Sequence, residues 1–106
     1  MTWTTDSSGT VTANGTEQIL DSPTSNGTYV FEVDTVNLAN GDYVELRCYD
    51  MVDGSNFRQV YQGSYQHAQI NNAKASPPIA VITQAKFTLK QTAGSNRNFP
   101  WKVMRI

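Results

Sequence analysis

Hydrophobic and polar residues alternate along several stretches of the chain. In residues 28–34, large hydrophobic side chains fill every second position, and acidic side chains stand at two of the positions between them. Consecutive side chains of a strand point to opposite faces of a sheet, so this period of two predicts a strand that buries Tyr29, Phe31 and Val33. The same pattern predicts strands over residues 42–52, 57–68, 85–94 and 99–106.

Turn residues separate these predicted strands. Asn40-Gly41 stands at the start of the second strand, and Asp53-Gly54 joins the second strand to the third, as expected for an antiparallel hairpin. Gly63 in mid-strand predicts a bulge or a close approach of another group to the backbone. Pro100 cannot donate a backbone hydrogen bond, which confines the start of the last strand to an edge or a bulge.

Weaker strand patterns complete an all-β prediction. Short strands are expected at residues 3–5, 11–13 and 17–20, while residues 66–76 lack a sustained apolar face and are expected to form one helical turn or a long crossing loop. About eight short strands favour a two-sheet antiparallel sandwich of jelly-roll or Greek-key type. We expect one such domain over residues 1–106, with a short N-terminal arm.

Composition agrees with this fold class. Hydrophobic residues make up 39% of the chain, and Thr, Ser, Asn and Gln account for 36 of its 106 residues, which is too polar for a helical bundle. Cys48 is the single cysteine, so an intrachain disulfide is excluded, and its place in the alternation predicts a core residue. We also expect no signal peptide and no membrane segment, because the start of the chain lacks both a basic and an apolar region.

The charges are divided between the two halves of the sequence. All nine acidic residues fall within positions 1–56 and seven of the eight basic residues within 57–106, although the net charge is only −1. This balance argues against direct nucleic-acid binding, which needs an uncompensated basic surface. Two uses of the division remain open: pairing of acids and bases within one molecule, or contact between patches of opposite sign on two molecules.

The sequence offers little for catalysis. His67 is the only histidine, and no nucleophile motif surrounds any serine or Cys48. Too few ligands are present for zinc, and residues 50–56 lack the spacing and the closing glutamate of a calcium loop, which favours a simple turn at Asp53. We therefore predict no enzymatic activity, no catalytic or metal-binding residues and no cofactor.

Two segments, GTYVFEVDTVNLANGDYVELRCYDMV and LKQTAGSNRNFPWKVMRI, carry a resemblance to a known family. Over Thr16 to Ile106 the chain resembles the capsid cement or decoration proteins of tailed bacteriophages. The resemblance implies a β-sandwich that is made in the host cytoplasm, binds the major capsid protein on the outside of an icosahedral shell, and stabilises the shell. It also implies a homo-oligomer, either a dimer or a trimer, with no membrane partner.

Residues in the predicted arm and in the last turn are the candidates for protein contacts. An exposed tryptophan can anchor a partner or cover its own core, and an arginine can pair with a carboxylate across an interface. The predicted interface residues are Trp3, Asn96, Arg97 and Asn98. The alternative function is a carbohydrate- or receptor-binding module of a phage tail or a polysaccharide-degrading system, in which Trp3, Tyr43 or Tyr49 would stack on sugars.

Overall fold

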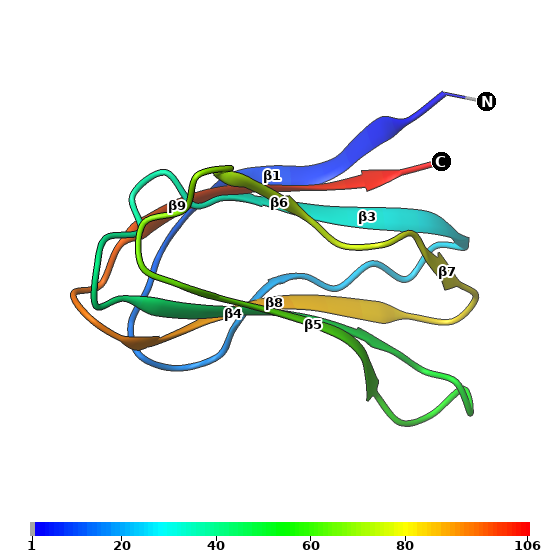
Figure 1. Ribbon diagram of the computed structural model, residues 1–106. Helices are drawn as coiled ribbons and strands as arrows, with labels where there is room; N and C mark the ends of the chain where they lie inside the picture. Colours follow the sequence, from blue (N-terminus) through cyan, green and yellow to red (C-terminus); the bar gives the residue numbers. More distant parts are fainter. Residues whose placement is uncertain (1) are drawn as a thin grey trace.

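Nine β-strands, arranged as two antiparallel sheets packed face to face, make up residues 2–106, the part of the chain described in this computed structural model (Figure 1). The first sheet consists of β1 (Thr4–Thr12), β9 (Asn98–Arg105), β3 (Gly27–Asp34), β6 (Ala73–Ala75) and β7 (Ile79–Val81). The second sheet consists of β2 (Gln18–Asp21), β8 (Ala85–Ala93), β4 (Tyr43–Asp50) and β5 (Arg58–Gln66). No helix that could span a membrane occurs in residues 2–106.

The strand order is that of a jelly roll. It runs β1-β9-β3-β6 in the first sheet, where β7 also pairs with β3, and β2-β8-β4-β5 in the second. If β6 and β7 are counted as one interrupted strand, the chain forms nested antiparallel pairs, from β1 with β9 on the outside to the β4–β5 hairpin at the centre. The predicted all-β, two-sheet antiparallel sandwich is therefore confirmed.

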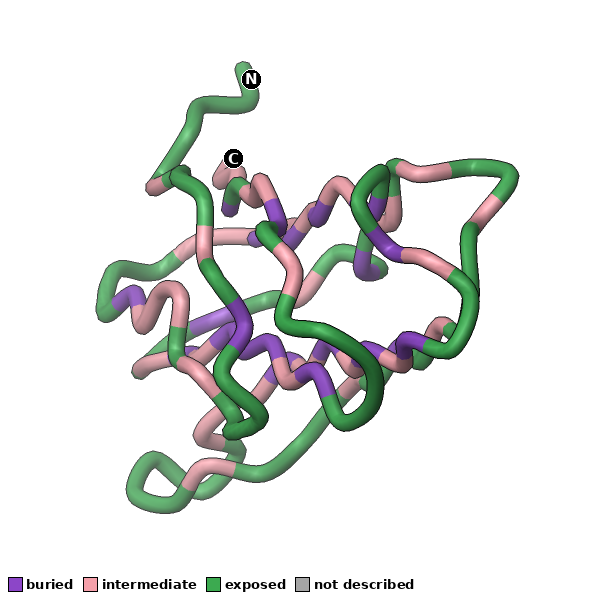
Figure 2. Tube along the Cα trace, turned by 90° about the vertical axis from the view of Figure 1, so that its left-hand side faces the viewer, coloured by how far each residue is buried: buried purple, intermediate pink, exposed green. Residues whose placement is uncertain are grey.

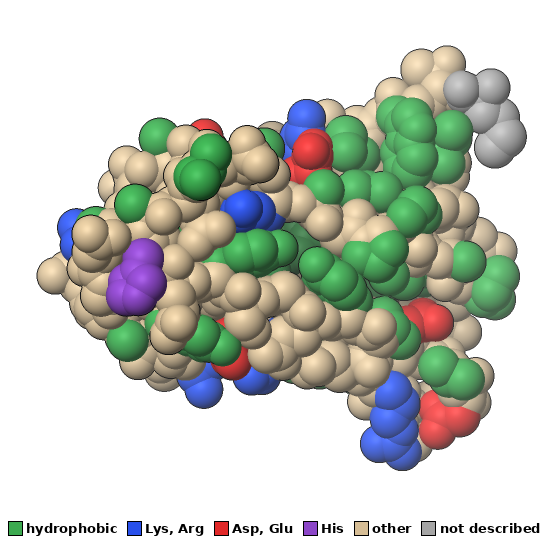
Figure 3. Space-filling model, viewed as in Figure 1, with side chains coloured by type: hydrophobic (Ala, Val, Ile, Leu, Met, Phe, Trp, Pro, Cys, Tyr) green, Lys and Arg blue, Asp and Glu red, His purple; other side chains and the backbone are tan. Residues whose placement is uncertain are grey.

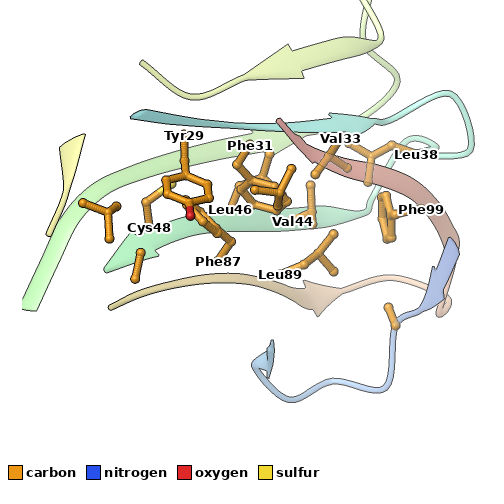
Figure 4. Packing of buried hydrophobic residues seen from close by; sticks show 14 residues of the cluster. Tyr29, Phe31, Val33, Leu38, Val44, Leu46, Cys48, Phe87, Leu89 and Phe99 are labelled. Atoms are coloured by element: carbon orange, nitrogen blue, oxygen red, sulfur yellow. The ribbon is translucent and has the colours of Figure 1, made fainter. Parts of the chain in front are cut away.

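The core lies between the sheets and is built from alternate residues of the facing strands (Figure 2). Phe87 of β8 lies with its ring centroid 5.7 Å from that of Phe31 and 6.1 Å from that of Tyr29, both on β3 (Figure 4). Cys48 is fully buried in this core, as its place in the alternation predicts. Fourteen buried hydrophobic residues form the cluster: Ala13, Tyr29, Phe31, Val33, Leu38, Val44, Leu46, Cys48, Val81, Ala85, Phe87, Leu89, Phe99 and Val103.

Some local expectations need correction. Residues 3–5 and 11–13 belong largely to one strand, β1, because pairing with β9 continues through the polar residues between them. Of the two expectations for residues 66–76, the long crossing loop is right for residues 67–72 and the helical turn is wrong; strand β6, at the end of this stretch, and β7 after it are additions. These short strands gain their hydrogen bonds from β3, a partner that the alternation within their own residues could not indicate.

Gly63 and Pro100 occupy the kinds of position that their chemistry requires. The register break in β5 falls at Val60 and not at Gly63, but a Cβ atom at Gly63 would lie 2.9 Å from the hydroxyl of Tyr65, so a side chain does approach the backbone closely there. Pro100 pairs with Thr10 of β1, and the ladder between β9 and β3 starts one residue later. The start of β9 is thus bonded on one side.

The two ends of the sandwich carry different connections (Figure 1). We call them the Asp42 end and the arm end. The Asp42 end carries the loops 13–17, 35–42, 67–72 and 94–97. The arm end carries residues 2–3, the C-terminus and the loops 22–26, 51–57, 76–78 and 82–84.

Candidate interaction surface

The Asp42 end is organised around a buried carboxylate. Asp42 is 2% exposed, and its Oδ2 accepts hydrogen bonds from Nε of Arg97 at 2.7 Å and from the backbone N–H of Ala39 at 2.9 Å. The hydrogen bond from Arg97 is the main reason that the pKa of Asp42 lies below its ordinary value. Asp42 therefore stays ionised at neutral pH and ties the β3–β4 loop to the β8–β9 loop.

A glycine allows this close contact. Gly94 has a φ of +87°, and a Cβ atom built on it would lie 1.8 Å from Oδ1 of Asp42. Both the left-handed backbone and the lack of space therefore require glycine at this position.

The β5–β6 loop joins the same cluster through His67. Its ring Nδ1 accepts a hydrogen bond from the backbone N–H of Gly41 at 2.9 Å, and the backbone N–H of His67 donates to the carbonyl of Asp42 at 3.0 Å. The first of these bonds requires the proton of a neutral His67 ring to lie on Nε2. His67 thus joins two loops that are far apart in the sequence.

Gln91 fixes the β8–β9 loop from inside. This buried side chain donates from Nε2 to the carbonyls of Ala93 at 2.9 Å and Ser95 at 2.7 Å, and its Oε1 accepts from the backbone N–H of Arg97 at 3.0 Å. The carbonyl of Arg97 in turn accepts from the N–H of Ala13 at 2.9 Å, which attaches the β1–β2 connection. All four loops of the Asp42 end are therefore linked to one another.

Apolar side chains project from this fixed framework. Ile70, in the β5–β6 loop, is 99% exposed, and Val36, in the β3–β4 loop, is 55% exposed. Single exposed aliphatic residues are common on protein surfaces, but an almost fully exposed isoleucine on a tied loop has the properties of a contact residue.

The predicted interface residues are divided between the two ends. Trp3 precedes β1 at the arm end and is 43% exposed. The other three lie at the Asp42 end, where Arg97 pairs with Asp42 of its own chain, Asn98 accepts a 2.7 Å hydrogen bond from the hydroxyl of Thr12, and Asn96 is exposed. Strand β1 separates the two groups, so they cannot form one patch; their role in protein contacts stays a prediction.

The outer face of the four-stranded sheet holds a polar network of its own. Glu17 accepts hydrogen bonds from Tyr49 at 2.5 Å and Thr88 at 2.6 Å, and it pairs with Arg47 at 3.2 Å. The ammonium group of Lys86 lies 4.5 Å from the ring centroid of Tyr49. Tyr49 is thus occupied on its ring and at its hydroxyl by groups of the same chain.

A shallow hollow of about 530 Å³ lies on the five-stranded sheet. Its lining includes Glu32 and Lys102, which pair at 3.3 Å, and Asp34, whose Oδ1 accepts from the N–H of Val36 at 3.0 Å. The Glu32–Lys102 pair and the Asp42–Arg97 pair each join an acid of the first half of the chain to a base of the second. The division of charge along the sequence is used, at these two places, within the molecule.

The ionisable groups of the described residues show no assembled reactive centre. Burial raises the pKa of the Cys48 thiol to about 12, so the nucleophilic thiolate is scarce at neutral pH. No group of three or more potential metal ligands occurs in residues 2–106. On the face turned to the viewer, Figure 3 shows charged side chains separated from one another by hydrophobic side chains and by other, uncharged surface. That the protein is not an enzyme stays a prediction for experiment.

No family model, curated protein or solved structure matches this chain. Its function must therefore be inferred from its own residues.

Proposed function

We propose that this protein is a structural virion subunit, a capsid cement or decoration protein that binds the major capsid protein on the outside of an icosahedral phage shell. The observation that carries the proposal is the Asp42 end, where four loops are tied together around a buried ion pair and present the exposed Ile70. We assign shell docking to this end. The shell as partner is supported by the resemblance of the sequence to cement proteins.

A tied set of loops suits adhesion. Loops that are already held in their bound arrangement lose little conformational entropy when they dock, so more of the contact energy appears as affinity. An apolar side chain such as Ile70 can then fill a shallow pocket of the partner, while the polar loops around it exclude water. Oligomeric subunits that grip several shell sites at once would add avidity to each weak contact.

Sugar binding has less support. Stacking on a sugar requires an open aromatic face, whereas Lys86 lies over the ring of Tyr49 and Glu17 binds its hydroxyl. The hollow on the five-stranded sheet includes Trp101 in its lining, but that residue also packs against the core. The carbohydrate-binding module is therefore kept as an outcome of the experiment below.

The test is co-sedimentation of the purified protein with DNA-filled phage heads that lack it. We expect saturable binding by the natural protein and a loss of roughly tenfold or more in affinity for Ile70→Asp. The matched control is Ile82→Asp, which changes an isoleucine that is 75% exposed at the arm end and should bind as the natural protein does.

The outcomes separate the parts of the proposal. No binding of the natural protein to any head preparation, together with binding on a glycan array that a Trp3→Ala change abolishes, would replace the cement function with the carbohydrate alternative. Equal binding by the two aspartate variants would contradict docking through the Asp42 end. Binding lost in Ile82→Asp alone would assign docking to the arm end.

A further inference from the structure

Strand β5 leaves one side of its backbone unpaired. It is the last strand of the four-stranded sheet, it is nine residues long, and it pairs with β4 alone. An edge strand of this length offers a row of free N–H and C=O groups to another strand, and proteins usually block such edges with charges, prolines, bulges or shortness.

The short edges of the molecule are protected by their length. Strand β2 has four residues, and β6 and β7 have three each. Strand β1 is as long as β5, and the break in its ladder at the acidic Asp6 likewise lies among its first residues, so β1 is a second long edge. In β5 the charge of Arg58 and the bulge at Val60 protect only the first residues. Residues 61–66, YQGSYQ, carry no charge, no proline and no register break.

The two faces of residues 61–66 differ. Opposite residues of neighbouring strands share a face, so Tyr61, Gly63 and Tyr65 lie on the inner face with Cys48, Leu46 and Val44 of β4. The hydroxyls of both tyrosines lie close to Gly63, about 3 Å from where its Cβ would be. The outer face carries Gln62, Ser64 and Gln66, which are exposed. Arg58 is the one charged residue of β5, so both faces of residues 61–66 are uncharged.

We infer that β5 pairs with β5 of a second copy of this chain, antiparallel and about a two-fold axis at Gly63, so that the two four-stranded sheets become one sheet of eight strands. In this register Gly63 lies opposite Gly63 of the second copy. Tyr61 lies opposite Tyr65, and Gln62 lies opposite Ser64.

The register places compatible groups opposite each other. Each glycine gap is flanked by tyrosines of both copies, a cross-strand arrangement that favours sheet pairing. No charged residue of one β5 lies opposite a like charge of the other, because Arg58 lies outside residues 60–66, the segment that this register pairs. A second copy is therefore better suited to this edge than a charged peptide.

The outer face places no like charges opposite each other. Arg47 of β4 lies opposite Gln62, and Glu45 lies opposite Ser64. Within one chain Gln62 donates to Oε2 of Glu45 at 3.3 Å and to Oγ of Ser64 at 3.0 Å, and Arg47 pairs with Oε1 of Glu45 at 2.8 Å. In the dimer, Gln62 of each copy lies opposite Ser64 of the other, so uncharged groups meet at the junction and the paired charges stay one strand away from it.

This inference goes beyond the proposed function, since self-association needs no shell. The test mixes two variants that each carry one added cysteine, Gln62→Cys and Ser64→Cys, and follows disulfide formation under mild oxidation on non-reducing gels. In the mixture, the two new cysteines lie directly opposite each other, where Cα atoms are about 4.5–5.5 Å apart and a disulfide can form. In either variant alone, the two identical cysteines lie diagonally across the strand pair, roughly 7–8 Å apart, which is too far for an unstrained disulfide. Cys48 is buried and should not react.

We expect the mixture to give several times more cross-linked dimer than either variant alone. The matched control is a mixture of Ser8→Cys and Thr10→Cys, which have the same spacing on the other long edge, β1, and should cross-link no more than each alone. Sedimentation should show a reversible dimer whose dissociation constant rises roughly tenfold or more in Ser64→Lys but not in Thr10→Lys.

Three results would overturn the inference. They are a natural protein that stays monomeric from micromolar to millimolar concentration, a β5 mixture that cross-links no better than the β1 mixture, and a Ser64→Lys variant that dimerises as the natural protein does. Failure here with intact shell binding would leave the proposed function standing, and a β5 dimer without shell binding would do the reverse.

Discussion

The two ends of the sandwich are stabilised in different ways. At the Asp42 end, loops far apart in the sequence hold one another, through Asp42 with Arg97 and His67 with Gly41. At the arm end, the β4–β5 turn holds itself, because Oδ1 of Asp53 accepts from the N–H groups of Ser55 at 2.9 Å and Asn56 at 2.8 Å. A turn whose hydrogen bonds are all internal fixes only its own shape. Loops that form hydrogen bonds with one another fix their relative positions. A docking surface needs the second property.

The largest expected effect comes from filling the space beside Asp42. Gly94→Ala forces a Cβ into Oδ1 of Asp42 and strains a left-handed backbone, so we expect a loss of roughly 3–5 kcal/mol in the free energy of unfolding. Gly41→Ala is the matched control, because its φ is +95° and nothing lies within 4 Å of the added atom. It should cost about 1–2 kcal/mol in urea unfolding. Equal losses of stability in the two variants would show that Asp42 moves aside at little cost.

The next effect comes from removing the buried charge. Asp42→Asn leaves Arg97 without its carboxylate, and since Arg97 is itself partly exposed we expect a loss of about 2–3 kcal/mol by chemical denaturation. Glu32→Gln breaks the more exposed pair with Lys102 and should cost at most about 1 kcal/mol. If both variants lose the same small amount, the Asp42–Arg97 pair does not organise its end.

The two ends should also respond to pH in opposite directions. Near the arm end, burial and the neighbouring Asp6 raise the pKa of Asp21 from 3.8 to about 6. A raised pKa means that the folded state holds its proton more tightly, so this site loses stability as pH rises from about 4 to 6. Asp42 has a lowered pKa, and its contribution is present above the unfolded value and is lost as pH falls.

Asp21→Asn should therefore stabilise the protein by about 1 kcal/mol at pH 7, after allowance for solvent screening, and have little effect near pH 4. The measurement is the urea midpoint of both proteins across this pH range. A gain that is the same at every pH would contradict the assignment to Asp21. Asp42→Asn should show the reverse trend, with its full loss at pH 7 and a smaller one at the lowest pH.

The smallest effect is expected at the self-contained turn. Asp53→Ala removes the acceptor for two backbone N–H groups that water can also satisfy, because the turn is exposed. We expect a smaller fall in the urea midpoint than for any of the destabilising variants above, and no change in hydrogen exchange at the Asp42 end. A fall as large as that of Asp42→Asn would erase the contrast between the ends.

The strands with clear alternation were predictable, but the arrangement of the loops was not. The alternation within one strand is enough to predict that Tyr29, Phe31 and Val33 are buried. The short strand β6, Ala-Lys-Ala, has no such signal, since its hydrogen bonds depend on β3. The partner of Arg97 lies 55 positions away in the sequence, and no local pattern reveals which carboxylate the jelly roll brings to it.

Other features of the Asp42 end left only weak signals. Gly41 and Gly94 mark turns. Their sequence neighbours do not show that the space beside Gly41 is open, whereas Gly94 packs against a buried carboxylate. Ile70 stands in a polar stretch, where its near-complete exposure becomes clear only from the course of the β5–β6 loop. Three of the predicted contact residues, Asn96, Arg97 and Asn98, lie at this end. No sequence pattern identifies the buried Asp42 that organises it.

Docking through the Asp42 end would be visible in the orientation of the subunit on a capsid. Cryo-electron microscopy of phage heads saturated with the protein, compared with heads that lack it, would show where each subunit lies and which end faces the shell. We expect added density on the outer surface, with the loops around Asp42 and Ile70 against the major capsid protein. Heads without added density, or subunits that face the shell with the arm end, would contradict this expectation.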